Sequence, residues 1–248
     1  MEDTGAAYLS TAACLRSGAG YTTLYVPKNI LPYYFLKAPE ALLKPINDGD
    51  RVEFKEKSFQ ELLSYDSIAY GMGMGVSLDV ALGAKFLIQN FTGKLILDAD
   101  GLNSLAFYGK ENVKDLFLQK KCDVLITPHG KEFSRISGKS VEDIRLNGKA
   151  LAENFARECK ISVLLKNAVS VITDGTETYL NDTGNSGQAK GGSGDVLSGV
   201  IAGLCAQGVS AFHAGVLGAY LTGKTAELIV SERGEYSMLA SDIAENLS

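Results

Sequence analysis

Short apolar runs alternate with longer segments of helical character along the sequence from Tyr21 onward. The run from Ile161 to Leu165 is apolar apart from one serine, which is typical of a strand buried on both faces of a parallel sheet. This alternation predicts an α/β fold with a mostly parallel central sheet and helices on both of its faces. Asp174-Gly175, between two β-rich runs, predicts a hairpin that adds antiparallel strands at one edge.

The helical segments are recognised by apolar residues that recur at helical spacing. We expect helices, the second of them only partly helical, at residues 4–16, 29–45, 76–90, 113–120, 141–159, 196–206, 211–228 and 238–246. No Pro/Ser-rich linker or low-complexity tract divides the 248 residues, so we expect a single domain over residues 1–248.

The composition argues against several classes of protein. The formal net charge of −5, with no run of Lys and Arg, argues against a nucleic-acid-binding surface, which needs a basic patch. No apolar run approaches the roughly 18 residues that span a membrane, and no basic stretch followed by an apolar core suggests a signal peptide. The four cysteines are scattered without a C-x-x-C pair, which favours reduced, buried thiols in a cytoplasmic protein.

The stretch from Gly191 to Gly199 contains four glycines and opens an apolar helical segment. Glycines before a helix let backbone N–H groups turn toward one point, where the helix N-terminus adds about half a unit of positive charge. Such a site suits a phosphate, or the charge that develops when phosphate is transferred. Asp195 at this site can act as a base that takes a proton from a hydroxyl. The alternative is an ordinary N-cap aspartate, but the glycine density and the upstream lysine strand favour a site.

Polar residues follow several predicted strands, at the edge where open α/β sheets bind ligands. Asp98 and Asp100 could hold Mg²⁺ or a hydroxyl-rich substrate, or Asp98 could cap the next helix, and their spacing leaves both readings open. Lys166 could extend to solvent or reach a ligand. His129 follows a strand and a proline, which makes it the better candidate of the two histidines, although a lone loop histidine is commonly a surface residue. The loop Gly71–Gly75 also follows a strand and lacks the spacing of a dinucleotide fingerprint.

The segment Gly191–Leu197 resembles the anion-hole motif of the ribokinase-like superfamily, and within it the ADP/ATP-dependent NAD(P)H-hydrate dehydratase family is the most similar. Three further blocks carry the narrower resemblance, namely Leu97–Asn103, Thr127–Glu132 and Ser17–Gly20, and all four occur in family order over nearly the whole chain. The family fold opens with a strand before the helix at 4–16, so the resemblance implies that this N-terminal strand is missing. Met72, Gly130-Lys131 and Asn167 depart from the family pattern.

The resemblance also implies which residues form the site. The residues that it assigns to the nucleotide are Lys166, Asn167, Ala168, Val169, Ser170, Gly192, Ser193 and Gly194. Those that it assigns to the hydrated cofactor are Ala6, Gly73, Asp98, Asn103, His129 and Asp195, and Asp195 is also the expected catalytic base. It assigns no residue to a metal.

The activity implied by the resemblance is a metabolite repair reaction, the ADP- or ATP-dependent dehydration of hydrated NADH or NADPH. Its co-substrate is an adenine nucleotide with Mg²⁺, and the family suggests a homotetramer. Phosphorylation would turn the ring hydroxyl into a good leaving group, and elimination of phosphate would restore the reduced nicotinamide. One alternative is a small-molecule alcohol kinase of the same superfamily, against which the His129 and Asp98 blocks argue. Another is a catalytically silent nucleotide-binding regulator, against which an intact Asp195 argues.

Overall fold

The computed structural model describes residues 4–108 and 113–247. Within those residues the first element is helix α1 (Thr4–Arg16). The strands are β1 (Thr23–Val26), β2 (Leu42–Pro45), β3 (Ser67–Tyr70), β4 (Lys94–Leu97), β5 (Asp123–Ile126), β6 (Ser162–Leu165), β7 (Ser170–Thr173) and β8 (Thr178–Asn181). The further helices are α2 (Glu56–Leu62), α3 (Leu78–Asn90), α4 (Ala99–Tyr108), α5 (Val113–Leu118), α6 (Gly130–Ser137), α7 (Val141–Cys159), α8 (Ser193–Ala206), α9 (Ala211–Arg233) and α10 (Ala240–Glu245), with 3-10 helices η1 (Leu31–Tyr34) and η2 (Ser186–Gln188).

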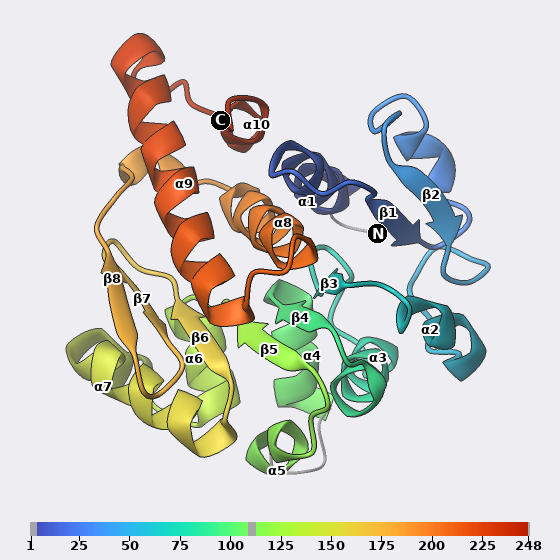
Figure 1. Ribbon diagram of the computed structural model, residues 1–248, viewed down its shortest axis with the longest axis horizontal. Helices are drawn as coiled ribbons and strands as arrows, with labels where there is room; N and C mark the ends of the chain where they lie inside the picture. Colours follow the sequence, from blue (N-terminus) through green and yellow to red (C-terminus); the bar gives the residue numbers. More distant parts are fainter. Residues whose placement is uncertain (1–3, 109–112, 248) are drawn as a thin grey trace.

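The central sheet has six strands in the order β3-β4-β5-β6-β7-β8 (Figure 1). Strands β3 to β6 pair in parallel, whereas β6–β7 and β7–β8 pair antiparallel. The predicted α/β fold with a mostly parallel sheet is therefore confirmed. The hairpin predicted at Asp174-Gly175 joins β7 to β8, as expected from the turn chemistry of that dipeptide.

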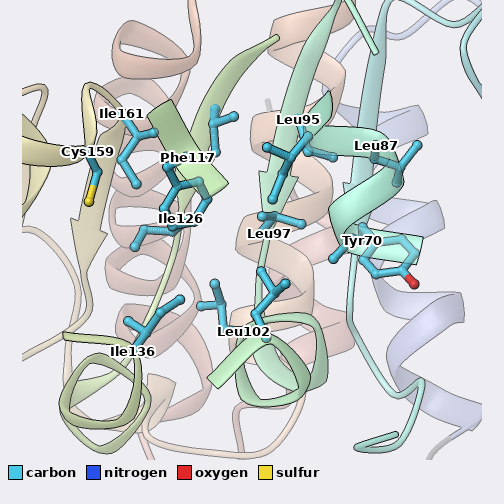
Figure 2. Close-up of a cluster of buried hydrophobic side chains, with 14 of the residues drawn as sticks. Tyr70, Leu87, Leu95, Leu97, Leu102, Phe117, Ile126, Ile136, Cys159 and Ile161 are labelled. Atoms are coloured by element: carbon cyan, nitrogen blue, oxygen red, sulfur yellow. The ribbon is translucent and has the colours of Figure 1, made fainter. Parts of the chain in front are cut away.

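Side chains of the central strands alternate between two hydrophobic clusters, because successive residues of a strand point to opposite faces. Leu95 and Leu97 pack with residues of α3 to α7 on one face, whereas Ile96 between them packs with α8 and α9 on the other. Figure 2 shows the first face, where Leu97 and Ile126 lie over Leu102. Each fully buried side chain of this kind contributes about 1.5–3 kcal/mol to the stability of the fold. Because helices cover both faces of these strands, both faces carry apolar side chains, and the strands appear in the sequence as apolar runs.

The region between α1 and the central sheet differs from the sequence-based expectation. The predicted strand at 21–26 forms β1, but β1 pairs in parallel with β2 in a separate two-stranded sheet. Residues 42–45 are a strand within a segment expected to be partly helical. Strand β2 is largely exposed and ends in Pro45, so it carries neither the apolar run nor the alternation by which strands are recognised. The unit packs through a small cluster of Val26, Ile30 and Tyr34.

Two expectations from composition can be compared with the structure. All four cysteines are free thiols, and Cys122, Cys159 and Cys205 are buried whereas Cys14 is half-buried. Within residues 4–108 and 113–247 we find no helix with both the length and the apolar character that a membrane crossing requires.

Helices α1 and α8 pack closely through small residues. A Cβ added at Gly199 would lie 2.8 Å from the carbonyl carbon of Ser10, and one added at Gly203 would lie 2.7 Å from the Cys14 oxygen. These contacts advance together along both helices, so α1 and α8 run in the same direction and begin at the same end. On its other side, α8 accepts a hydrogen bond at the Ala202 oxygen from Ser67 Oγ of β3, at 2.7 Å.

We expect Gly199→Ala to destabilise the protein by ~1–3 kcal/mol, because an added methyl group in a filled interface forces backbone shifts. The measurement is the free energy of unfolding in urea. Gly20→Ala is the matched control, since a Cβ at Gly20 would meet nothing within 4 Å. Equal unfolding curves for the two variants would show that α1 and α8 are not in close contact.

Candidate active site at the carboxyl edge of the sheet

The polar residues that follow strands β3 to β6 come together at one edge of the sheet. Because these strands are parallel and in register, with Tyr70 opposite Leu97 and Leu97 opposite Ile126, the segments after them leave at the same edge. His129 and Lys166 form a parallel bridge just beyond β5 and β6. The backbone N–H of Lys166 also donates to the Pro128 oxygen at 2.9 Å.

Lys166 and Asp98 form a largely buried ion pair at this edge. The distance from Lys166 Nζ to Asp98 Oδ1 is 2.8 Å, and the two side chains are 23% and 2% exposed. Asp98 Oδ1 also accepts from the Ala99 N–H at 2.8 Å, and Asp98 Oδ2 accepts from Ser198 Oγ at 2.8 Å. Both oxygens of Asp98 are thus bonded to donors of the protein itself.

The surroundings of Lys166 favour its charged form. Burial acts to lower the pKa of Lys166, but the carboxylates of Asp98, Glu132 and Asp195 outweigh burial and raise its pKa above the ordinary value of 10.5. The ammonium group is therefore charged at every physiological pH. Asp195, the last of these carboxylates, lies in the first turn of α8.

The N-terminus of α8 faces the same point. Gly192 is its N-cap residue, with φ of 95°, and as a glycine it has no side chain with which to cap the helix. A Cβ added at Gly194 would lie 3.3 Å from Lys166 Nζ and 3.7 Å from Asp98 Oδ2, so the first turn of α8 lies directly over the ion pair. An ammonium and a helix N-terminus at one point form a favourable environment for an anion. Since Gly192 occupies the N-cap position, Asp195 is not the N-cap of α8.

The beginning of α1 and α10 border this glycine turn. A Cβ added at Gly192 would lie 2.9 Å from the Ala240 Cβ and still closer to Leu9 Cδ1, and the left-handed φ also favours glycine. Ala6 lies one turn before Leu9 in α1 and is 2% exposed. Since α1 and α8 begin at the same end, Ala6 lies at the end of the molecule that carries Gly192.

His129 is the N-cap residue of α6. Its Nδ1 accepts from the backbone N–H groups of Lys131 at 3.1 Å and Glu132 at 3.3 Å. Its own backbone N–H donates to Glu132 Oε2 at 2.8 Å, which completes a capping box. These bonds fix the imidazole with Nδ1 as an acceptor. The side chain is about half exposed, with Nε2 3.4 Å from Glu132 Oε1.

The turn from Asn167 to Ser170 joins β6 to β7 and continues from Lys166. Asn167 Oδ1 accepts from the Ala168 N–H at 2.8 Å, and Ser170 Oγ donates to the Asn167 oxygen at 3.1 Å. Val169 is exposed at its tip. Ala99 and Lys160 are the non-glycine residues with left-handed φ within the described part of the chain, so Asn167 adopts an ordinary φ. The turn is therefore formed without glycine at 167.

Gly73 and Asn103 come from the segments that follow β3 and β4. Gly73, with φ of 65°, belongs to the loop after β3, and the Gly75 N–H ties this loop to Asp100 Oδ2 at 2.8 Å. Asn103, in α4, accepts at Oδ1 from Arg135 Nη1 of α6 at 2.7 Å. The expected nucleotide and substrate residues thus share one edge, but Asn103 has its amide oxygen bonded to Arg135.

Sequence reasoning did not identify Ser198, which holds Asp98, or Arg135, which holds Asn103. Ser198 carried a local signal, since it is the one polar side chain in the apolar segment 196–206. A buried hydroxyl in such a segment requires a partner. Arg135 lies on a helix that was not predicted, and nothing in its neighbourhood in the sequence singles it out.

The described residues do not form a metal site of their own. Within residues 4–108 and 113–247 we find no group of three or more His, Cys, Asp or Glu side chains arranged to hold an ion. Mg²⁺ commonly binds through substrate phosphates and water with one or two carboxylates. The carboxylates at this edge therefore fit a magnesium ion that arrives on the phosphates of a nucleotide.

The fold and the site together define a class of protein. A ribokinase-like superfamily protein from Enterococcus faecalis superposes with a TM-score of 0.79 at 24% identity, covering 98% of this chain and 80% of that one. The ADP/ATP-dependent NAD(P)H-hydrate dehydratase from Bacillus subtilis, co-crystallised with ATP and Mg²⁺, superposes with a TM-score of 0.81 at 26% identity, covering 98% and 82%. The chain is a ribokinase-like α/β protein.

The sequence comparisons narrow this class to a family. The chain belongs to the NAD(P)H-hydrate dehydratase (Carb_kinase) family, whose model matches residues 1–248. It is 33% identical over 250 residues to the bifunctional NAD(P)H-hydrate repair enzyme Nnr of Moorella thermoacetica, covering 98% of this chain and 46% of that protein. It is 32% identical over 247 residues to the ADP-dependent (S)-NAD(P)H-hydrate dehydratase of Cenarchaeum symbiosum, covering 98% and 82%. The chain thus spans about half the length of the bifunctional relatives it matches.

We expect Lys166→Met to destabilise the protein by ~3–5 kcal/mol, because it leaves the Asp98 carboxylate buried without its counter-ion. The measurement is urea unfolding at neutral pH. There the wild-type pair contributes fully, since the folded pKa of Lys166 is raised and the contribution is lost only as pH rises through that pKa.

Lys28→Met is the matched control for this prediction, because Lys28 pairs with Asp48 in an exposed ion pair. Exposed pairs contribute about 0–1 kcal/mol. The double variant Lys166→Met/Asp98→Asn should recover part of the loss. If Lys166→Met is no less stable than Lys28→Met, the pair is not a buried one.

Proposed function

We propose that this chain catalyses the ADP- or ATP-dependent dehydration of hydrated NADH or NADPH and so restores the reduced nicotinamide. The observation that carries the proposal is the meeting of the Lys166 ammonium, the N-terminus of α8 and Asp195 at one point of the sheet edge. Membership of the NAD(P)H-hydrate dehydratase family supports the substrate class.

The nucleotide phosphates would lie against Lys166 and the backbone N–H groups of Gly192 to Gly194. The turn Asn167–Ser170, which continues from Lys166, would contact the rest of the nucleotide. Ion pairing and backbone donors fixed before the ligand arrives stabilise the charge on a phosphoryl group in transfer. Magnesium would enter on the nucleotide phosphates and neutralise part of their charge.

Asp195 would act as the base for a hydroxyl on the hydrated nicotinamide ring. The hydroxyl oxygen forms a bond to the terminal phosphorus, the bond from that phosphorus to the nucleotide breaks, and the hydroxyl proton passes to Asp195. The ring carbon–oxygen bond then breaks, inorganic phosphate leaves with the bonding electrons, and loss of a ring proton restores the double bond. Ala6, Gly73, Asn103 and His129 would border the hydrated cofactor.

Three expectations from the sequence stay predictions. They are the single domain over residues 1–248, the homotetramer and the cytoplasmic location. Light scattering on the purified protein measures the second.

The direct test mixes the protein with hydrated NADH, Mg²⁺ and ADP or ATP. We expect the absorbance of reduced nicotinamide to return together with inorganic phosphate. A phosphorylated product that accumulates without phosphate release would instead identify an alcohol kinase. Nucleotide binding without turnover would identify a regulator.

We expect Asp195→Asn to lower turnover by roughly 10²–10⁴-fold, the range for loss of a general base. Asparagine keeps the shape of the side chain, and Asp195 is not the N-cap, so the melting curve and ADP affinity should be retained. Asp115→Asn, in the first turn of α5, is the matched control and should turn over normally. Normal turnover by Asp195→Asn would contradict the proposed mechanism.

We expect His129→Asn to raise the KM for the hydrated cofactor about tenfold, the effect of losing one hydrogen bond of ~1.4 kcal/mol. Asparagine is a favoured N-cap residue, so this variant keeps the start of α6 while removing the imidazole. Steady-state kinetics and calorimetry with ADP are the measurements. A loss of ADP affinity at unchanged KM would move His129 to the nucleotide side.

A further inference from the structure

Asp98 is bonded in a way that differs from a residue waiting for a ligand. Its carboxylate is buried beneath Gly194, and its donors come from three places: Lys166 after β6, Ser198 in α8 and its own neighbour Ala99. Asp98 is only 1% exposed, so these donors of the protein, rather than groups at the surface, surround its carboxylate. The bonding instead connects Ser198 through Asp98 to Lys166.

We propose that Asp98 and Ser198 are positioning residues that hold the Lys166 ammonium against the first turn of α8, rather than groups that bind the hydrated cofactor. This inference rests on the proposed function, because it assigns Lys166 to the nucleotide phosphates. Asp98 fixes the charge and orientation of Lys166, and Ser198 fixes the orientation of Asp98.

The geometry of α8 supports a positioning role. Ser198 lies one helical turn after Gly194, so the helix that presents the backbone donors also carries the hydroxyl that holds Asp98. A lysine side chain has a flexible four-carbon stem and a single point charge, so it needs a fixed partner to stay in one place. Because Asp98 bonds both to Lys166 and to Ser198 of α8, the ammonium and the backbone donors of α8 are held in a fixed relative position.

The backbone beside Asp98 is a second, independent observation. Ala99 has φ of 47°, a left-handed conformation that is unfavourable for a residue with a side chain. In this conformation its N–H bonds back to Asp98 Oδ1 at 2.8 Å. Strained backbone persists where the surrounding structure holds a functional group in a required orientation. Here that group is the Asp98 carboxylate.

The charge of Asp98 has two opposing effects on a bound nucleotide. It repels the phosphates, but it also keeps Lys166 protonated against burial. The other titratable groups around Lys166 are Glu132 and Asp195, with His129 on the adjoining strand end. Near neutral pH the two effects of removing Asp98 partly cancel. At alkaline pH, Lys166 beside a neutral residue at position 98 loses its proton more easily. The weaker attraction for the nucleotide phosphates then dominates.

The experiment measures ADP affinity by calorimetry in wild type, Asp98→Asn, Ser198→Ala and a control, with melting curves for each. The control is Asp123→Asn, whose carboxylate accepts from the Ala211 N–H at 2.8 Å at the opposite edge of the sheet. In wild type and in the control, ADP affinity should stay constant from about pH 7.5 to 9.5, because Lys166 stays charged. In Asp98→Asn, ADP affinity should fall by at least about tenfold as the pH rises over the same range.

Ser198→Ala should weaken ADP binding by about 3–10-fold at every pH, since it removes one hydrogen bond and leaves the Asp98 charge in place. An alkaline profile of Asp98→Asn equal to that of wild type, or a raised KM for the hydrated cofactor with unchanged ADP binding, would overturn the inference. If Asp98→Asn does not fold, wild-type ADP affinity in Ser198→Ala overturns it. Wild type that binds no ADP would refute the proposed function itself.

Discussion

The ion pair between Asp98 and Lys166 connects the ends of two strands that are not neighbours in the sheet, and through Ser198 it also connects them to α8. Asp98 follows β4, Lys166 follows β6, and Ser198 belongs to α8, which packs on one face of the sheet. Removing a carboxylate and an ammonium from water is costly, and the cost is offset only when their geometry is good and their remaining lone pairs are bonded. That requirement sets the position of α8 over the sheet edge, and with it the position of Gly192 to Asp195.

Much of this arrangement could be predicted because its signals are local in the sequence. Apolar strands such as 161–165 and the glycine-rich start of α8 are each recognisable within about ten residues. The parallel order of β3 to β6 then places Asp98, His129 and Lys166 at one edge without further information. The family blocks agreed with these signals, so the class of site could be stated before its geometry was known.

What could not be predicted depends on contacts between distant residues or on weak local patterns. Ser198 and Asp98 are 100 positions apart, and Asn103 and Arg135 are 32 apart, so no window of sequence contains either pair. Strand β2 was missed because an exposed strand in a two-stranded sheet shows no apolar run. The sequence offered two readings of Asp98, as a ligand-binding acid or a helix cap, and neither pointed to its bonds with Lys166 after β6 and Ser198 of α8.

The close packing of α1 against α8 couples remote positions to the reaction. Gly199 lies five residues from Gly194 in the same helix, a distance of about 7.5 Å along the axis. A stiff helix moves as a rod, so any side chain that lifts α8 away from α1 also shifts the backbone donors relative to Lys166. Residues such as Ser10 and Cys14, which contact no ligand in the proposed mechanism, therefore set the alignment of the site. Substitutions along this interface would therefore change turnover by shifting the backbone donors of α8 relative to Lys166, without altering any residue of the site.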